Sequence, residues 1–324
     1  MTYLALLFSI WAAIAVLQPA PKGGMGVRWL KRLGPYLVTG VVAPLPIWFW
    51  YFHRPQPAPH KEDLFRGISY ERDVRKVPRP VVMHIARVDL GEPSISFLTS
   101  PRGVNEPAFG GSTTSEFLVK HDLQLAINGD FFLPWWSDGP GNFYPKTGYP
   151  VDVLGASVSN GVKHGWEVVP YSALVVGPDR KVSIVEVKDR NTPLPNCIQA
   201  ISGKTLLVSN GRVTDAARVN SEAATSKHPR TAVALDEMGR TLMLVVVDGR
   251  QPGYSEGVSL AELSEFLVEH GAYRAINLDG GGSSTMVSDD GHGGYRTLNI
   301  PIHTRIPWRQ RTVANHFGVF AEAL

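Results

Sequence analysis

The chain contains almost no cysteine. Cys197 is the only one in 324 residues, so neither an internal disulfide nor a zinc site built on several cysteines can form. Histidine does not take its place, because His228, His303 and His316 are scattered and lack the i, i+4 spacing of a helical zinc pair. A disulfide scaffold and a zinc enzyme are therefore disfavoured.

Acidic residues are missing from the start of the chain. Residues 1–60 contain no Asp or Glu but hold five of the 32 Lys and Arg residues, which leaves 27 basic against 29 acidic residues in the remainder. The net charge of +3 therefore comes from this N-terminal segment. Because the remainder has no basic excess, it lacks the electrostatic footprint of a nucleic-acid-binding protein. We expect no nucleic-acid partner.

Two apolar stretches open the chain, at residues 1–17 and 34–52. The second has no charged residue, ends in a run of aromatic residues and is about long enough to cross a bilayer as a helix. The basic cluster between the stretches is expected to stay in the cytoplasm, and a start at Met25 instead of Met1 would leave a single signal anchor. Both topologies predict a bacterial inner or cytoplasmic membrane protein with its domain on the periplasmic or extracellular side.

The sequence predicts three parts: a membrane anchor of one or two segments (1–52), a Pro-rich linker and lead-in (53–79) and a domain (80–324). Strand-like runs fill the domain, for example at residues 81–90 and 241–247. Thr113 with Glu116, and Ser259 with Glu262, form capping boxes that mark two helix starts. We therefore predict an α+β fold, with a mixed β-sheet core flanked by helices and preceded by transmembrane segments.

Two strand-like runs end abruptly in acidic, glycine-bearing turns, at residues 126–132 and 277–286. The first turn carries Asn128 and Asp130. The second carries Asp279, three glycines and three hydroxyl side chains: Gly280, Gly281, Gly282, Ser283, Ser284 and Thr285. Such a turn offers hydroxyls and uncluttered N–H groups to an anion, although a tight hairpin would also use the glycines. It is neither a P-loop, since no Lys follows in the required spacing, nor a Gly-x-Ser-x-Gly elbow.

Five motifs, taken together and in this order, resemble the phosphodiester glycosidase family over roughly residues 80–322. They are residues 228–236, residues 245–250 with Ser255 and Gly257, residues 277–286, Asn299 with Pro301, and residues 311–316. The resemblance implies hydrolysis of the bond between a sugar's anomeric carbon and a phosphodiester, releasing the sugar and a phosphomonoester. Because the predicted membrane anchor is of a bacterial type, the expected substrates are envelope or exopolysaccharide glycans with sugar-1-phosphate linkages.

This chemistry requires cations for the phosphate, hydrogen-bond donors and at least one carboxylate. Arg230 and Arg311 are candidates for a phosphate clamp, because a guanidinium binds two phosphate oxygens at once; either could instead form a surface ion pair. Asp279 is the first candidate for nucleophile or general base, followed by Asp248 and Asp130, although each could simply cap a turn. The separation of the carboxylates would decide between retention and inversion.

The remaining candidates concern the sugar and a cation. The turn from Gly280 to Thr285 is expected to cradle the phosphate or sugar hydroxyls, and Asn128 and Asn315 are expected to bind sugar hydroxyls or satisfy local backbone. Trp135 and Trp136 offer either a sugar platform or packing. Clustered Asp oxygens beside a phosphate also suit calcium or magnesium.

Two other functions remain open from the sequence. One is a noncatalytic glycan-binding or exopolysaccharide assembly protein that uses the same cleft. The other is a metal-dependent phosphodiesterase that breaks the P–O bond instead of the glycosidic bond.

Overall fold

The computed structural model describes residues 49–103, 106–137, 141–189 and 192–324. It has two compact units, Met1–Pro55 and Gln56–Leu324. Nearly all of the two apolar stretches, from residue 1 to residue 48, lies outside the described residues. In the part of the chain that is described, no helix is both long enough and apolar enough to cross a membrane. The predicted transmembrane segments thus fall almost entirely on residues that the structure does not describe.

The second unit is mostly β-sheet, so the α+β prediction is wrong. The helices α4 (Thr114–Lys120), α5 (Glu222–Thr225) and α6 (Leu260–Glu269) have only 7, 4 and 10 residues. Every pairing between named strands in the described residues is antiparallel, so the sheets are not mixed. Short turns join only some of these neighbours, such as β1 (His60–Phe65) and β2 (Ile68–Arg75); others, such as β6 (Leu125–Asn128) and β23 (His316–Phe320), come from distant parts of the chain, so local patterns do not show their relative direction.

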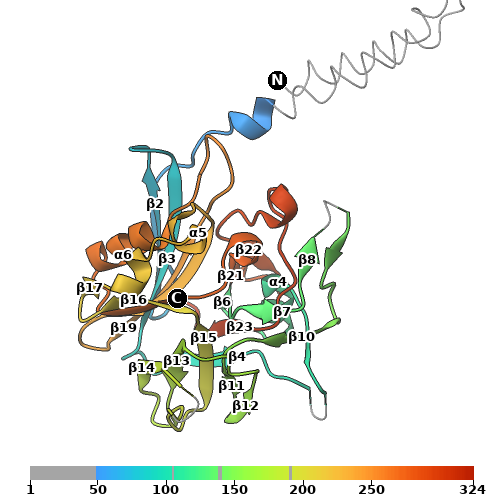
Figure 1. The fold of residues 1–324 in the computed structure, drawn as a ribbon, viewed down its shortest axis with the longest axis vertical. Helices are drawn as coiled ribbons and strands as arrows, with labels where there is room; N and C mark the ends of the chain where they lie inside the picture. Colours follow the sequence, from blue (N-terminus) through green and yellow to red (C-terminus); the bar gives the residue numbers. More distant parts are fainter. Residues whose placement is uncertain (1–48, 104–105, 138–140, 190–191) are drawn as a thin grey trace, which may run out of the picture. The chain divides into compact units, whose positions relative to one another are not determined.

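An eight-stranded sheet forms the largest layer (Figure 1). Its strands, in spatial order, are β1 (His60–Phe65), β2 (Ile68–Arg75), β3 (Val81–Asp89), β19 (Thr241–Val247), β18 (Arg230–Leu235), β20 (Arg274–Asn277), β16 (Thr205–Ser209) and β17 (Arg212–Val213). Strands β1 and β2 lie in the segment expected to be a linker and lead-in, and β2 pairs with β3 along its length. The sheet of the domain thus begins at His60.

Helix α6 covers one face of this sheet. Its apolar side chains, among them Leu263, Phe266 and Leu267, pack on strand residues such as Val245. The predicted capping box is confirmed, since Ser259 Oγ accepts from the Glu262 N–H and the Glu262 side chain accepts from the Ser259 N–H. A short helix suffices here because its apolar face, rather than its length, provides the stability.

The opposite face packs against two five-stranded sheets (Figure 1). One has the order β22 (Tyr295–Thr297), β21 (Met286–Asp289), β6 (Leu125–Asn128), β23 (His316–Phe320), β4 (Ser96–Thr99). The other has the order β12 (Val162–His164), β11 (Ser157–Ser159), β15 (Gln199–Gly203), β13 (Tyr171–Val176), β14 (Val182–Val187). Buried residues of all three sheets, such as Ile127, Leu174 and Val246, share one core.

Smaller elements complete the unit. Helix α4, with the predicted capping box of Thr113 and Glu116, packs Phe117 and Leu118 on the outer face of the sheet that contains β6. Strands β5 (Phe109–Gly110), β10 (Pro150–Val153) and β7 (Phe132–Leu133) form a three-stranded sheet. Strands β8 (Trp136–Ser137) and β9 (Phe143–Tyr144) form a two-stranded sheet, in the segment where the sequence shows no clear periodicity.

A buried carboxylate, Asp248, ties the eight-stranded sheet to the segment after β22. Its Oδ1 accepts from Asn299 Nδ2 at 3.1 Å and from the Ile300 N–H at 3.0 Å. Its Oδ2 accepts from Tyr254 Oη at 3.2 Å and lies 3.1 Å from His84 Nε2. Because a carboxylate only accepts, His84 Nε2 carries a hydrogen. With four donors around a side chain that is 1% exposed, Asp248 is a structural centre and has no free oxygen for a substrate.

We expect Asp248→Ala to lower the free energy of unfolding by about 3 kcal/mol or more, because four buried donors lose their acceptor. Urea unfolding followed by circular dichroism measures this change. The matched control is Asp215→Ala, because Asp215 is exposed at the start of a short 3-10 helix and should give a difference near zero. Equal unfolding midpoints for the two variants would contradict the structural assignment of Asp248.

Candidate active site

The turn after β20 places one carboxylate at the rim of the sheets. Asp279 Oδ1 accepts from the Gly280 N–H at 2.9 Å, and Oδ2 accepts from Ser283 Oγ at 2.6 Å. The main chain of Asp279 also joins β20 to the tip of β6: its N–H donates to Gly129 O, and its carbonyl accepts from Asn128 Nδ2 at 2.7 Å. The two turns that the sequence singled out therefore meet in space.

Burial is the largest influence on the Asp279 carboxyl and raises its pKa above the ordinary value. The Arg311 guanidinium and the hydrogen bond from Ser283 act in the opposite direction, since both stabilise the ionised form. Asp279 itself is only half-buried, unlike Asp130 and Asp248, which are each 1% exposed. It is therefore the one of the three predicted carboxylates that a substrate can reach.

The glycines of this turn allow two guanidinium groups to approach it. Gly281 has a φ of 65°, and a Cβ there would lie 3.1 Å from Arg250 Nη2. A Cβ on Gly282 would lie 3.0 Å from both Arg311 Nη2 and His303 Nδ1. Side chains at these positions would push the cations away. The glycine run is therefore needed for close approach, in addition to its conformational freedom.

A neutral histidine holds each of the two arginines. Arg250 donates from Nε at 3.3 Å to His228 Nδ1, and Arg311 donates from Nε at 3.3 Å to His303 Nδ1. Burial, followed by the neighbouring arginines, lowers the pKa of His228 to about 4 and that of His303 to about 3. Near neutral pH both imidazoles are thus uncharged acceptors, which orient the guanidinium groups without repelling them. Arg311 Nη1 also donates to Ser283 Oγ at 3.3 Å.

An aromatic residue of the segment between β7 and β10 lies beside Arg311. The Cζ atom of Arg311 is 4.9 Å from the ring centroid of Trp135, whose side chain remains 49% exposed. Trp136 stacks on Tyr144 across the β8–β9 pair, with centroids 4.2 Å apart. Trp135 therefore presents an aromatic surface at the site, while Trp136 also stabilises the hairpin.

Arg230 lies beside the glycine turn, where a Cβ on Gly280 would be 3.8 Å from its Cδ, but its guanidinium bonds to backbone carbonyls. Its Nε donates to Val258 O at 3.1 Å, and its Nη2 donates to Ala223 O and Ser226 O, both at 2.9 Å. Burial, helped by the nearby Arg250, lowers the pKa of Arg230 to about 10. The side chain is 7% exposed and anchors the backbone around α5, so these contacts favour a structural role.

Sequence reasoning missed Arg250, His228 and His303. A signal for the first two was present, because Arg250 ends the motif at residues 245–250 and His228 opens the motif at residues 228–236. Their roles depend on long-range contacts: Arg250 has a positive φ of 58°, which turns its side chain toward a glycine turn some thirty positions further along. His303 lies in a segment without any recognisable motif.

The predicted residues Asn128, Asp130 and Asn315 are near the site but buried. Asn128 Oδ1 accepts from Thr231 Oγ1 at 2.8 Å and from the Thr285 N–H at 3.1 Å. Asp130 accepts from Ser202 Oγ and Asn315 Nδ2, both at 2.7 Å, and burial raises its pKa to about 7. These side chains hold the strand tips together and have few free polar atoms for a sugar.

Ser284 and Thr285 are also buried, at 1% and 0% exposure. Their hydroxyl groups have no hydrogen-bond partner within the described ranges. Of the three predicted hydroxyl side chains, Ser283 is therefore the one that contacts the carboxylate and Arg311. As for a metal, no group of three His, Cys, Asp or Glu side chains that could hold an ion occurs among the residues that the structure describes. Calcium or magnesium stays a prediction.

Comparisons with known proteins find relatives of this chain in sequence and in structure. The sequence model of the phosphodiester glycosidase family matches residues 121–320. The human N-acetylglucosamine-1-phosphodiester alpha-N-acetylglucosaminidase is 30% identical over 189 residues, which cover 54% of this chain and 34% of the human protein. The mouse protein of the same name is 28% identical over 228 residues, covering 64% of this chain and 40% of the mouse protein. The aligned regions thus span well under half the length of these relatives.

Two solved structures share the fold. The catalytic domain of zebrafish N-acetylglucosamine-1-phosphodiester alpha-N-acetylglucosaminidase superposes with a TM-score of 0.55 at 22% identity, covering 83% of this chain and 85% of that one. A hypothetical protein from Synechocystis superposes with a TM-score of 0.54 at 17% identity, covering 82% and 64%. The family match includes β6, β18, β19, β20 and the turn that bears Asp279, and it extends over more than half of the chain. The chain therefore belongs to the phosphodiester glycosidase family.

Proposed function

We propose that this protein hydrolyses the glycosidic bond of a sugar-1-phosphodiester. The observation that carries the proposal is one half-buried carboxylate, Asp279, placed at a glycine turn between two histidine-held guanidinium groups, Arg250 and Arg311. The guanidinium groups suit the two non-bridging oxygens of a phosphodiester. The carboxylate suits the anomeric carbon of the attached sugar, and Trp135 suits the apolar face of its ring.

In the proposed reaction, the bond between the anomeric carbon and the phosphate oxygen breaks. Its electron pair goes to the phosphate, where Arg250 and Arg311 stabilise the growing charge. Asp279 either attacks the anomeric carbon or deprotonates a water that does so. Water finally supplies a hydroxyl to the sugar and a proton to the phosphate side. Because a phosphate leaves readily without protonation, a second accessible carboxylate is not required, in keeping with the burial of Asp130 and Asp248.

The proposed natural substrates are envelope or exopolysaccharide glycans. This choice follows from the sequence-based expectation of an exported domain, which stays a prediction. The names of the human and mouse relatives refer to N-acetylglucosamine-1-phosphodiesters. A soluble methyl ester of N-acetylglucosamine-1-phosphate is therefore the first substrate to test.

Reaction in oxygen-18 water tests the bond that is cut. We expect release of the sugar with the label on its anomeric hydroxyl and none in the phosphate, as measured by mass spectrometry. Label in the phosphate would contradict glycosidic cleavage and favour a phosphodiesterase. Binding of the ester without any product would favour a noncatalytic glycan-binding protein.

We expect Asp279→Asn to lower kcat/KM by at least about a thousandfold, because it removes the charge with almost no change of shape. Urea unfolding should show a native-like midpoint, which separates loss of chemistry from loss of fold. The control is Asp289→Asn, at the end of β21. Full activity of Asp279→Asn would contradict the role of this carboxylate as nucleophile or base.

Both arginines should be needed as guanidinium groups. We expect Arg250→Lys and Arg311→Lys each to lower kcat/KM about a hundredfold, because an ammonium cannot donate to two phosphate oxygens in a fixed fork. Steady-state kinetics measures the loss, with Arg212→Lys in the exposed strand β17 as the control. Equal values of kcat/KM for all three variants would contradict the proposed binding of the phosphate by Arg250 and Arg311.

The rate should depend on the ionisation of Asp279. Burial raises the pKa of this carboxyl, and only its ionised form can act as nucleophile or base. We therefore expect kcat/KM to fall on acidification with a midpoint above the ordinary range of aspartate. His228, with a pKa of about 4, stays neutral through most of that interval and continues to hold Arg250. A profile that stays flat into the ordinary aspartate range would contradict this role.

A further inference from the structure

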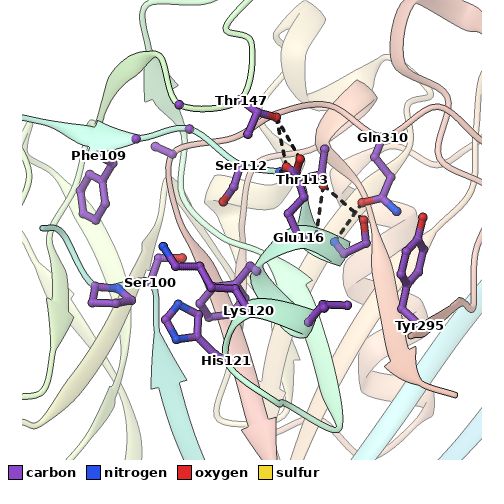
Figure 2. Close-up of a pocket in the computed structure, with 18 of the residues that line it drawn as sticks. Ser100, Phe109, Ser112, Thr113, Glu116, Lys120, His121, Thr147, Tyr295 and Gln310 are labelled. Carbon is purple, nitrogen blue, oxygen red and sulfur yellow. Dashed lines mark hydrogen bonds between the residues drawn. The ribbon is translucent and has the colours of Figure 1, made fainter. Parts of the chain in front are cut away.

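A large groove lies beside α4, away from the Asp279 turn. It has a volume of about 900 Å³ and is lined by α4 with the residues before it, Ser100 and Pro101, the turn at Thr147, Tyr295 of β22, and the segment from Trp308 to Ala314 (Figure 2). None of Asp279, Ser283, Arg250 and Arg311 lines it. Its volume matches that of sites for ligands of a few hundred daltons, comparable to a di- or trisaccharide.

Two large aromatic side chains stand exposed in this groove. Tyr295 is 47% exposed and Trp308 is 59% exposed. Flat aromatic faces next to hydrogen-bonding groups complement a sugar ring, which has an apolar face and a rim of hydroxyls. Figure 2 shows Tyr295 on one side of the groove below Gln310, with Thr147 and Glu116 nearer its upper centre. The groove thus combines aromatic faces with polar groups.

The polar groups are held in place before any ligand binds. Glu116 accepts from the Thr113 N–H at 2.7 Å and from Thr147 Oγ1 at 3.1 Å (Figure 2). Gln310 Oε1 accepts from the Ser115 N–H at 3.1 Å. This bond fixes the amide and leaves its two N–H groups as donors. A site organised in advance loses less conformational entropy on binding.

The groove and the candidate active site share one wall. Gln310 bonds Ser115 in the groove, whereas the next residue, Arg311, bonds Ser283 at the Asp279 turn. Further along, Ala314 lines the groove while the side chain of Asn315 bonds Asp130. Adjacent residues of an extended segment point to opposite sides. A single segment therefore separates the two sites.

We propose that the groove is a second glycan-binding site, which holds a part of the same polymer a few sugars away from the linkage that is cut. The identity of the polymer rests on the proposed function, whereas the presence of a sugar-binding groove does not. Such a site would favour polymeric over short substrates. It would act by keeping the chain at the enzyme between successive cleavages.

The test measures binding without turnover. The protein carries Asp279→Asn, and the probe is a hexamer of N-acetylglucosamine joined through 1-phosphodiesters, with binding followed by calorimetry. We expect Tyr295→Ala to weaken binding about tenfold, as expected from the loss of one ring stacking on a sugar. Gln310→Glu should weaken it as well, because it keeps the acceptor for Ser115 but removes both N–H donors.

The matched control is Trp166→Ala. Trp166 is 54% exposed, similar to Tyr295, but it does not line the groove. Tyr295 lies on the short edge strand β22, so its removal should leave the unfolding midpoint near that of the parent. The proposal would be overturned if Tyr295→Ala and Gln310→Glu both bound the hexamer as tightly as Trp166→Ala does. It would also be overturned if Trp166→Ala weakened hexamer binding as much as the groove variants do.

A second measurement separates this proposal from the proposed function. In the protein with Asp279 intact, the ratio of kcat/KM for the hexamer to that for the methyl ester should fall about tenfold in Tyr295→Ala. An unchanged ratio would count against the groove. The protein could instead bind the hexamer in a way that depends on Tyr295 and yet hydrolyse neither substrate. That result would support the glycan-binding groove and contradict the proposed glycosidase activity.

Discussion

The candidate site depends on the approach of two guanidinium groups, Arg250 and Arg311, to one carboxylate at a turn without side chains. Two cations repel each other, and burial adds to the cost of charging them. Three features offset this: the negative charge of Asp279, the glycines at 281 and 282, and the neutral histidines that accept from each arginine. The site is therefore arranged for an additional negative charge, such as that of a phosphodiester.

Three aspartates that look alike in the sequence have different environments. Asp130, Asp248 and Asp279 each end a strand or follow one, and each has a glycine beside it. Asp248 is surrounded by four donors, and Asp130 is held by Ser202 and Asn315, so both are buried and bonded within the protein. Only Asp279 combines partial exposure with neighbouring cations. The two buried aspartates therefore stabilise the edge of the sheets at which Asp279 lies.

Much of the local structure was predictable. The strand-like runs at residues 81–90 and 241–247 marked β3 and β19, and the two capping boxes marked α4 and α6, because these signals act over a few residues. The α+β class was wrong because the helices are few and short, and the mixed sheet was wrong because strand signals do not reveal how strands pair. The sequence did not show that the Arg230 guanidinium donates to the carbonyls of Ala223, Ser226 and Val258, and it missed Arg250.

The sequence by itself determined several of the segments that become strands, where the acidic glycine turns occur and which family the motifs resemble. These properties depend on side-chain periodicity and backbone permissiveness, which are local. Only the tertiary structure decided that Asn128 meets the Asp279 turn, that Arg250 approaches this turn while the Arg230 guanidinium bonds to backbone carbonyls, and that Gln310 and Arg311 contact different sites. The reason is that burial and hydrogen bonding between distant residues, which no local pattern encodes, select among chemically equivalent side chains.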